Sequence, residues 1–153
     1  MTNKNLKFTK QQTEVLKCVV DHIIPAKDPM PSASDANAVI FISSAVSISD
    51  QSRKSILECL NKIDAMAQEK GFSYPRLNQE NQKEILLDIE ANHNQCFRLI
   101  VRETYNSYYT NPMVLKLIGL PGRPPQPLGY ELNQASLDIL EPVKERGEIW
   151  RPA

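Results

Sequence analysis

The sequence has no excess of charge of either sign, no apolar run long enough to cross a bilayer and few glycines. Its 153 residues carry 18 Lys and Arg against 18 Asp and Glu. A balanced chain has no long-range field that would attract nucleic acid or an anionic membrane surface. No stretch approaches the roughly 18 consecutive apolar residues of a membrane-spanning helix. We therefore expect neither nucleic-acid binding nor direct membrane insertion.

Sequence signatures of catalysis are also missing. The five glycines stand singly, and without Gly-x-Gly no phosphate-cradling loop is expected. No Gly-x-Ser-x-Gly elbow occurs, and neither histidine has a motif neighbour that would mark it as a general base. Cys18, Cys59 and Cys96 lack Cys-x-x-Cys spacing and are expected to be buried free thiols. The chain is therefore expected to have no catalytic residue, no metal site and no cofactor of its own.

The first residues carry no arginine pair, apolar core or small-residue cleavage site of the kind that directs export. We expect a cytoplasmic location for the chain as it stands. A periplasmic location is expected instead if a signal has been removed, or if the chain is exported together with a partner.

What the sequence does contain is a series of amphipathic helical patterns without strand-like alternation. Thr9 and Gln12 form a capping box, and later helices are expected to begin near Asp35, Ser49 and Asn78. A further helix follows Asn94. The pattern predicts an all-α fold, a single bundle of five to six helices.

The expected second helix, from Asp35, has apolar residues around most of its circumference and no charge between Asn37 and Ser49. Such a helix is usually buried on more than one side. In the fifth helix, Arg98, Arg102 and Glu103 are expected to face solvent.

The helical pattern ends within residues 108–130. Asn111 suits an N-cap, Pro112 the first helical position and Gly119 the left-handed closing residue, which predicts a helix of about two turns. Prolines at 121, 124, 125 and 127 then prevent regular helix. We expect one domain over residues 1–153, with a bundle at about 9–119 and a Pro-rich extended arm at about 120–153. The arm has few apolar residues, so it must pack on the bundle or on another chain.

Two alternatives from the residues remain open. Glu90-x-x-His93 has the spacing of a di-iron ligand pair, although no second such pair exists. A stand-alone metal-binding helical protein or enzyme using Glu90, His93, Asp21 or His22 is one alternative. The other is a homo-oligomeric structural protein that uses the arm on a copy of itself.

Two stretches together resemble the gluconate 2-dehydrogenase subunit 3 family. The first runs from Asp21 through the Ile23-Ile24-Pro25 break to Ile42, and the second from Tyr108 to Gly122, followed by the Pro-rich run. Two departures are Ser32, where the family commonly has glycine, and the lack of a twin-arginine signal.

The resemblance implies a role rather than a reaction. The chain would be a non-catalytic small subunit of a flavin-dependent sugar or alcohol dehydrogenase complex. It would stabilise the large subunit of the glucose-methanol-choline type, which carries the FAD, or assist its maturation, and a cytochrome subunit can accompany the two. The predicted partner-binding residues are Tyr108, Tyr109, Asn111, Pro112, Leu120, Pro121, Arg123, Pro124, Pro125, Pro127, Tyr130 and Trp150.

Overall fold

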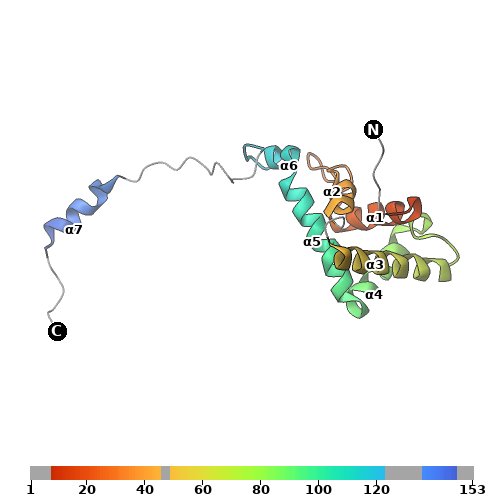
Figure 1. The fold of residues 1–153 in the computed structure, drawn as a ribbon. Helices are drawn as coiled ribbons and strands as arrows, with labels where there is room; N and C mark the ends of the chain where they lie inside the picture. The colour runs from red at the N-terminus through yellow and green to blue at the C-terminus, as the bar shows by residue number, and fades with distance from the viewer. Residues whose placement is uncertain (1–7, 46–48, 123–135, 148–153) are drawn as a thin grey trace, which may run out of the picture. The chain divides into compact units, whose positions relative to one another are not determined.

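The computed structural model describes residues 8–45, 49–122 and 136–147, and the chain separates into two compact units, residues 1–123 and 124–153. Within these described ranges the structure is helical and has no strand, which confirms the all-α prediction (Figure 1). None of the described helices is long and apolar enough to cross a membrane. The first unit contains α1 (Lys10–Ile23), α2 (Ala38–Ala45), α3 (Asp50–Glu69), the 3-10 turn η1 (Tyr74–Arg76), α4 (Gln79–Asn92), α5 (Asn94–Thr110) and α6 (Pro112–Leu117).

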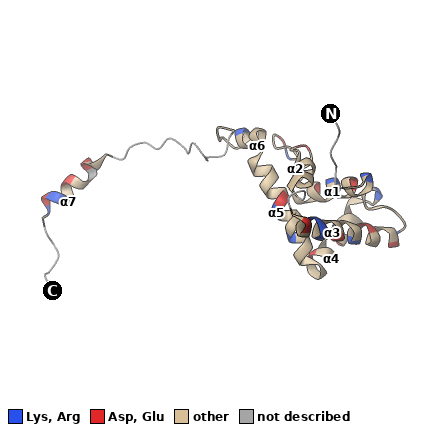
Figure 2. Ribbon diagram, in the orientation of Figure 1, with Lys and Arg blue, Asp and Glu red and all other residues tan. Residues whose placement is uncertain are grey.

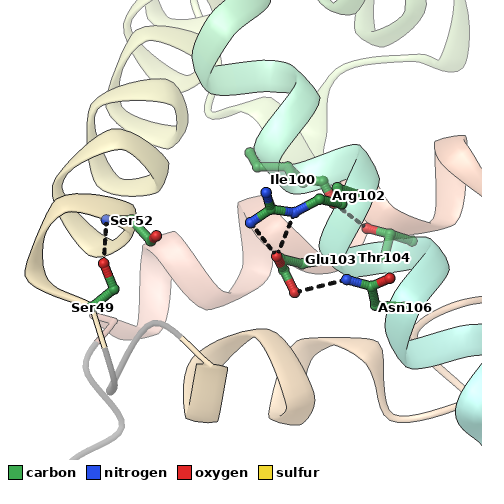
Figure 3. A network of polar contacts seen from close by, with 7 residues as sticks. All are labelled: Ser49, Ser52, Ile100, Arg102, Glu103, Thr104 and Asn106. Carbon is green, nitrogen blue, oxygen red and sulfur yellow. Dashed lines mark hydrogen bonds and ion pairs between the residues drawn. The ribbon is translucent and has the colours of Figure 1, made fainter.

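Most helices begin at the predicted caps. Thr9 Oγ1 accepts a hydrogen bond from the Gln12 amide at 3.1 Å, and Gln12 Oε1 accepts from the Thr9 amide at 3.0 Å. Asn78 Oδ1 accepts from the Asn81 amide at 2.9 Å. Ser49 caps α3 in the same way (Figure 3). Each cap satisfies backbone donors that the first helical turn leaves unpaired.

The core lies where α1, α3, α4 and α5 meet, and α2 packs on α1 and α5. Burial of each large aliphatic side chain contributes about 1.5–3 kcal/mol before conformational entropy is subtracted. The free cysteines differ from the prediction, because only Cys59 is buried whereas Cys18 and Cys96 are partly exposed. Fully buried aliphatic residues include Val15, Leu16, Val19, Val20, Ile42, Ile56, Leu60, Ile63, Ile85, Ile89 and Ile100.

Tyr74 is a core residue that helical periodicity did not identify, because it lies in a short turn between helices. Its hydroxyl donates to the Gln82 carbonyl at 3.3 Å, and Gln82 Nε2 donates to the Tyr74 carbonyl at 2.9 Å. Gln82 Oε1 then lies 2.8 Å from His22 Nε2, which requires the proton on that ring nitrogen. Burial raises the pKa of the Tyr74 phenol above its ordinary value. These contacts connect η1 and α4 to the end of α1.

The prediction for α2 was wrong in its start and in its burial. The helix begins at Ala38, because Asn37 takes a left-handed conformation with φ of 66°. Ile40 is 63 % exposed and Phe41 is 39 % exposed, so only one side of α2 faces the core. The lack of charge in this stretch therefore indicates an exposed apolar surface and not a helix enclosed on several sides.

The connection between α1 and α2 is folded onto the bundle. Ala33 and Ala36 are buried, and Ser34 donates from its amide to Asp21 Oδ1 at 2.8 Å and from its hydroxyl to Asp21 Oδ2 at 2.7 Å. Hydrogen bonds to an ionised carboxylate are stronger than those between neutral groups. Asp21 thus fixes this connection.

The second unit is described over residues 136–147. It contains η2 (Leu137–Leu140) and α7 (Glu141–Glu145), with Ser136 accepting from the Asp138 amide at 3.1 Å. Gly147 follows with φ of 73°. Residues 137–145 are thus helical within the arm that was predicted to be extended.

Replacing Asp21 with alanine is expected to lower the free energy of unfolding by about 2–3 kcal/mol, because Ser34 loses both charge-assisted bonds and its part-buried amide is left unpaired. Urea denaturation followed by circular dichroism measures this change. Glu14→Ala is the matched control, since Glu14 is an exposed carboxylate on the same helix, and it should change the value by less than about 0.5 kcal/mol. Equal effects of the two substitutions would contradict the role given to Asp21.

Candidate partner-binding site

The corner between α5 and α6 is built by Asn111. Its Oδ1 caps α6 by accepting from the Met113 amide at 2.9 Å, while its Nδ2 donates to the Ala36 carbonyl at 2.8 Å. Pro112 occupies the first helical position, as predicted. One side chain therefore starts α6 and also ties it to Ala36, two residues before α2.

The end of α6 is closed by Gly119, whose φ is 86°. The Leu120 amide donates to the Leu115 carbonyl at 2.8 Å, and the Gly119 amide to the Lys116 carbonyl at 3.0 Å. This pairing is the Schellman arrangement that satisfies the last carbonyls of a helix. The predicted short helix with its glycine stop is confirmed.

Tyr108 and Tyr109 are adjacent in sequence but have opposite environments. Tyr108 is 2 % exposed and its hydroxyl donates to the Pro31 carbonyl at 2.8 Å. Burial, and secondarily the neighbouring Tyr109, raise the pKa of Tyr108. Tyr109 is 50 % exposed, meets the Tyr108 ring edge-on at 5.3 Å and stacks on Tyr105 at 6.1 Å. Of the two, Tyr109 is the one that another chain can reach.

The remaining predicted partner-binding residues include a half-buried residue, exposed residues and residues outside the described part of the chain. Asn111 is half-buried and uses its amide inside the bundle, whereas Pro112, Leu120 and Pro121 are exposed. Their contact with a partner stays a prediction. Lying outside the described residues are Arg123, Pro124, Pro125, Pro127, Tyr130 and Trp150.

Charge is absent from residues 104–115 and 36–49 of the sequence. On α5 the last charges are Arg102 and Glu103, which pair at 2.7 Å, and the Asn106 amide donates to Glu103 at 3.3 Å (Figure 3). The expectation that Glu103 faces solvent was wrong, because its side chain is only 14 % exposed. Figure 2 shows the uncharged end of α5 in tan beside α6, which carries a blue segment.

The end of α5 and the segment from α6 to Leu120 carry six exposed apolar side chains that we call the apolar corner, and Lys116 is also exposed on α6. The exposed fractions of these six lie between 39 % and 50 %. Sequence reasoning singled out only part of this set, because α6 was recognised by its caps and not by which of its residues face outward. The lack of charge in residues 104–115 was the available signal. The apolar corner consists of Tyr105, Tyr109, Met113, Leu117, Ile118 and Leu120.

A groove of about 1150 Å³ with a mixed polar and apolar lining lies between α3 and the α4–α5 junction and contains His93. Lys62 Nζ donates to His93 Nδ1 at 3.2 Å and pairs with Glu58 at 3.0 Å, whereas Glu90 is exposed. Within residues 8–45, 49–122 and 136–147, no three His, Cys, Asp or Glu side chains are grouped so that they could hold a metal ion. Asp21 and His22, the other residues of the enzyme alternative, serve the contacts described above.

A family model described as Gluconate 2-dehydrogenase subunit 3 matches residues 10–122. The chain belongs to this family. The matched range begins with α1 and ends at Gly122, so it contains every helix of the first unit. The comparisons with curated proteins and with solved structures gave no match. The family name implies a subunit of a gluconate 2-dehydrogenase complex, which contains other subunits.

Ser32, which stands where the family commonly has glycine, is accommodated in the gluconate 2-dehydrogenase subunit 3 fold without backbone strain. Asn37 is the one non-glycine residue with positive φ in the described part of the chain, so Ser32 needs no glycine-like conformation. Its hydroxyl accepts from the Asp35 amide at 3.2 Å and donates to the Asp35 carboxylate at 3.0 Å. The serine thus stabilises the turn that leads into α2.

Tyr108→Phe is expected to lower the free energy of unfolding by about 1–2 kcal/mol, because the Pro31 carbonyl loses its donor. Thermal or urea unfolding measures the loss. Tyr109→Phe removes an exposed hydroxyl from the next residue and should change stability by less than about 0.5 kcal/mol. If the two variants were equally stable, the Tyr108–Pro31 bond would have no structural role.

Proposed function

We propose that this protein is a non-catalytic small subunit that binds the large, FAD-bearing subunit of a sugar or alcohol dehydrogenase complex and stabilises it or assists its maturation. The observation that carries the proposal is family membership over residues 10–122. The apolar corner supports it, because interface cores are depleted in charge and enriched in Tyr and Met. A cytochrome subunit is a further candidate partner.

The flavin chemistry would belong to the partner. The groove that contains His93 is lined by both polar and apolar side chains, and the glycine-rich phosphate loop typical of dinucleotide sites has no counterpart in the sequence. The working compartment follows the partner in this proposal: the cytoplasm if the large subunit stays there, or the periplasm after export with the large subunit.

The arm from Leu120 onward is proposed as a main contact. Leu137 is 71 % exposed, Leu140 43 % and Val143 55 %, so these three apolar side chains of the second unit are uncovered. Such short helical turns have too little core of their own to offset the entropy of ordering. Burial of these side chains on the large subunit would supply the missing stabilisation.

Affinity purification of the tagged full-length chain from its source is expected to recover a larger chain with bound flavin, identified by mass spectrometry and by the flavin absorption spectrum. Expression of the larger chain without this protein should reduce its soluble yield and its flavin content. Co-expression should restore both. If the large subunit folds, binds flavin and turns over equally well without this protein, the proposal is wrong.

A chain that ends at Gly122 should keep the thermal unfolding midpoint of the full-length protein within a few degrees, because the first unit holds the core. It should retain much less of the flavoprotein in the same purification, since the proposed arm contact is gone. Full retention by this shortened chain would show that the arm is not a main contact.

A further inference from the structure

We propose that Cys59 and Cys96 are a redox-active thiol pair that reacts with small disulfides bearing carboxylate groups. Cys96 forms the first bond from the groove that contains His93, and Cys59 then completes a disulfide between α3 and α5. The inference goes beyond the proposed function, since it concerns thiol chemistry within this chain and does not depend on a partner subunit.

The two thiols meet where α3 packs on α5. Cys59 is fully buried in the core, and Cys96 packs against the same core from α5. Burial, and secondarily the contact with the Cys96 thiol, raise the pKa of Cys59. Contact between two sulfur atoms is the geometric requirement for a disulfide. A buried, protonated thiol is inert toward reagents in solution, so Cys59 is suited to act second.

Cys96, unlike Cys59, can be reached from solvent. It is partly exposed, lines the groove of about 1150 Å³ and donates from its thiol to the His93 carbonyl at 3.2 Å. The Lys62 ammonium donates to His93 Nδ1 at 3.2 Å and interacts electrostatically with the Cys96 sulfur. Reactive cysteines lie in partly exposed, electropositive surroundings of this kind. Cys96 is therefore the thiol that acts first.

The charges that line the groove favour an anionic reagent. Lys62, Arg98 and Arg102 line it, against the single acid Glu58. Two of these cations are already paired, Lys62 with Glu58 at 3.0 Å and Arg102 with Glu103 at 2.7 Å. Arg98 is exposed and forms no ion pair with any residue that the structure describes. Its guanidinium is thus available to a carboxylate, which it can hold through two parallel hydrogen bonds.

The reaction consists of two thiol–disulfide exchanges. In the first, the Cys96 sulfur attacks one sulfur of the external disulfide, whose S–S bond breaks, and one thiol leaves with the proton of Cys96. In the second, the Cys59 sulfur attacks the Cys96 sulfur of the mixed disulfide, and the second thiol leaves with the proton of Cys59. The two cysteines lose two electrons, and the external disulfide gains them as it becomes two thiols.

The test uses the reduced full-length protein and oxidised glutathione, a disulfide that carries several carboxylates. Peptide mapping by mass spectrometry is expected to find a Cys59–Cys96 disulfide. Cys59→Ala should stop the reaction after the first exchange and leave one glutathione on Cys96, whereas Cys96→Ala should leave Cys59 reduced. Cys18→Ala is the matched control, because Cys18 lies on α1 outside the groove, and it should form the Cys59–Cys96 disulfide at the rate of the unchanged chain.

The result for the unchanged chain does not depend on whether a variant folds. Glutathione adducts without a Cys59–Cys96 bond would overturn the inference, and so would an internal bond to Cys18. The same conclusion follows if a folded Cys59→Ala variant, checked by circular dichroism, carries no glutathione on Cys96.

Arg98→Glu tests the preference for an anionic disulfide. It should slow the reaction with oxidised glutathione roughly fivefold and should not slow the reaction with cystamine, a cationic disulfide, because a nearby charge attracts only reagents of opposite sign. Lys10→Glu makes the same change of charge at an exposed position on α1. It should leave both rates within about twofold of those of the unchanged chain. If Arg98→Glu slows both reagents equally or changes neither rate, the assignment of carboxylate-bearing disulfides is wrong.

Discussion

The bundle depends on hydrogen-bond partners for the backbone amides and carbonyls of the connection between α1 and α2. This connection contains prolines at 25, 29 and 31, which have no amide hydrogen, yet part of it is buried. A buried carbonyl or amide without a partner costs free energy comparable to a lost hydrogen bond. Asp21 supplies acceptors for Ser34, Tyr108 a donor for the Pro31 carbonyl, and Asn111 a donor for the Ala36 carbonyl.

Two of these hydrogen bonds connect the two stretches of sequence that resemble the family. Tyr108 lies 77 residues from Pro31 in sequence, and Asn111 lies 75 residues from Ala36. The second stretch therefore provides side-chain donors for backbone carbonyls of the first. Both fall inside the matched range of 10–122. The two stretches that carry the resemblance are thus hydrogen-bonded to each other in the folded protein.

The same hydrogen bonds determine which side chains of α5 and α6 face solvent. With Tyr108 committed to the core, Tyr109 is directed to solvent, and the Asn111 cap sets which residues of α6 are exposed. The Arg102–Glu103 pair (Figure 3) holds the last charges on α5, and the next charged residue in the sequence is the exposed Lys116 on α6. A protein that works alone would expose the apolar corner to self-association. In a permanent subunit of a complex, a partner covers such a surface, and this is the situation proposed for this chain.

The sequence by itself determined the all-α class, most helix ends and the short helix from Pro112 to Gly119, because caps, prolines and glycines act through their immediate neighbours. Only the tertiary structure decided that Asp21 fixes the α1–α2 connection, that Tyr74 is buried in a turn, and that α2 exposes Ile40 and Phe41. It also decided which of two adjacent tyrosines faces outward. Those outcomes depend on contacts between residues far apart in the chain, and helical periodicity reports only which residues share a face, not what that face meets.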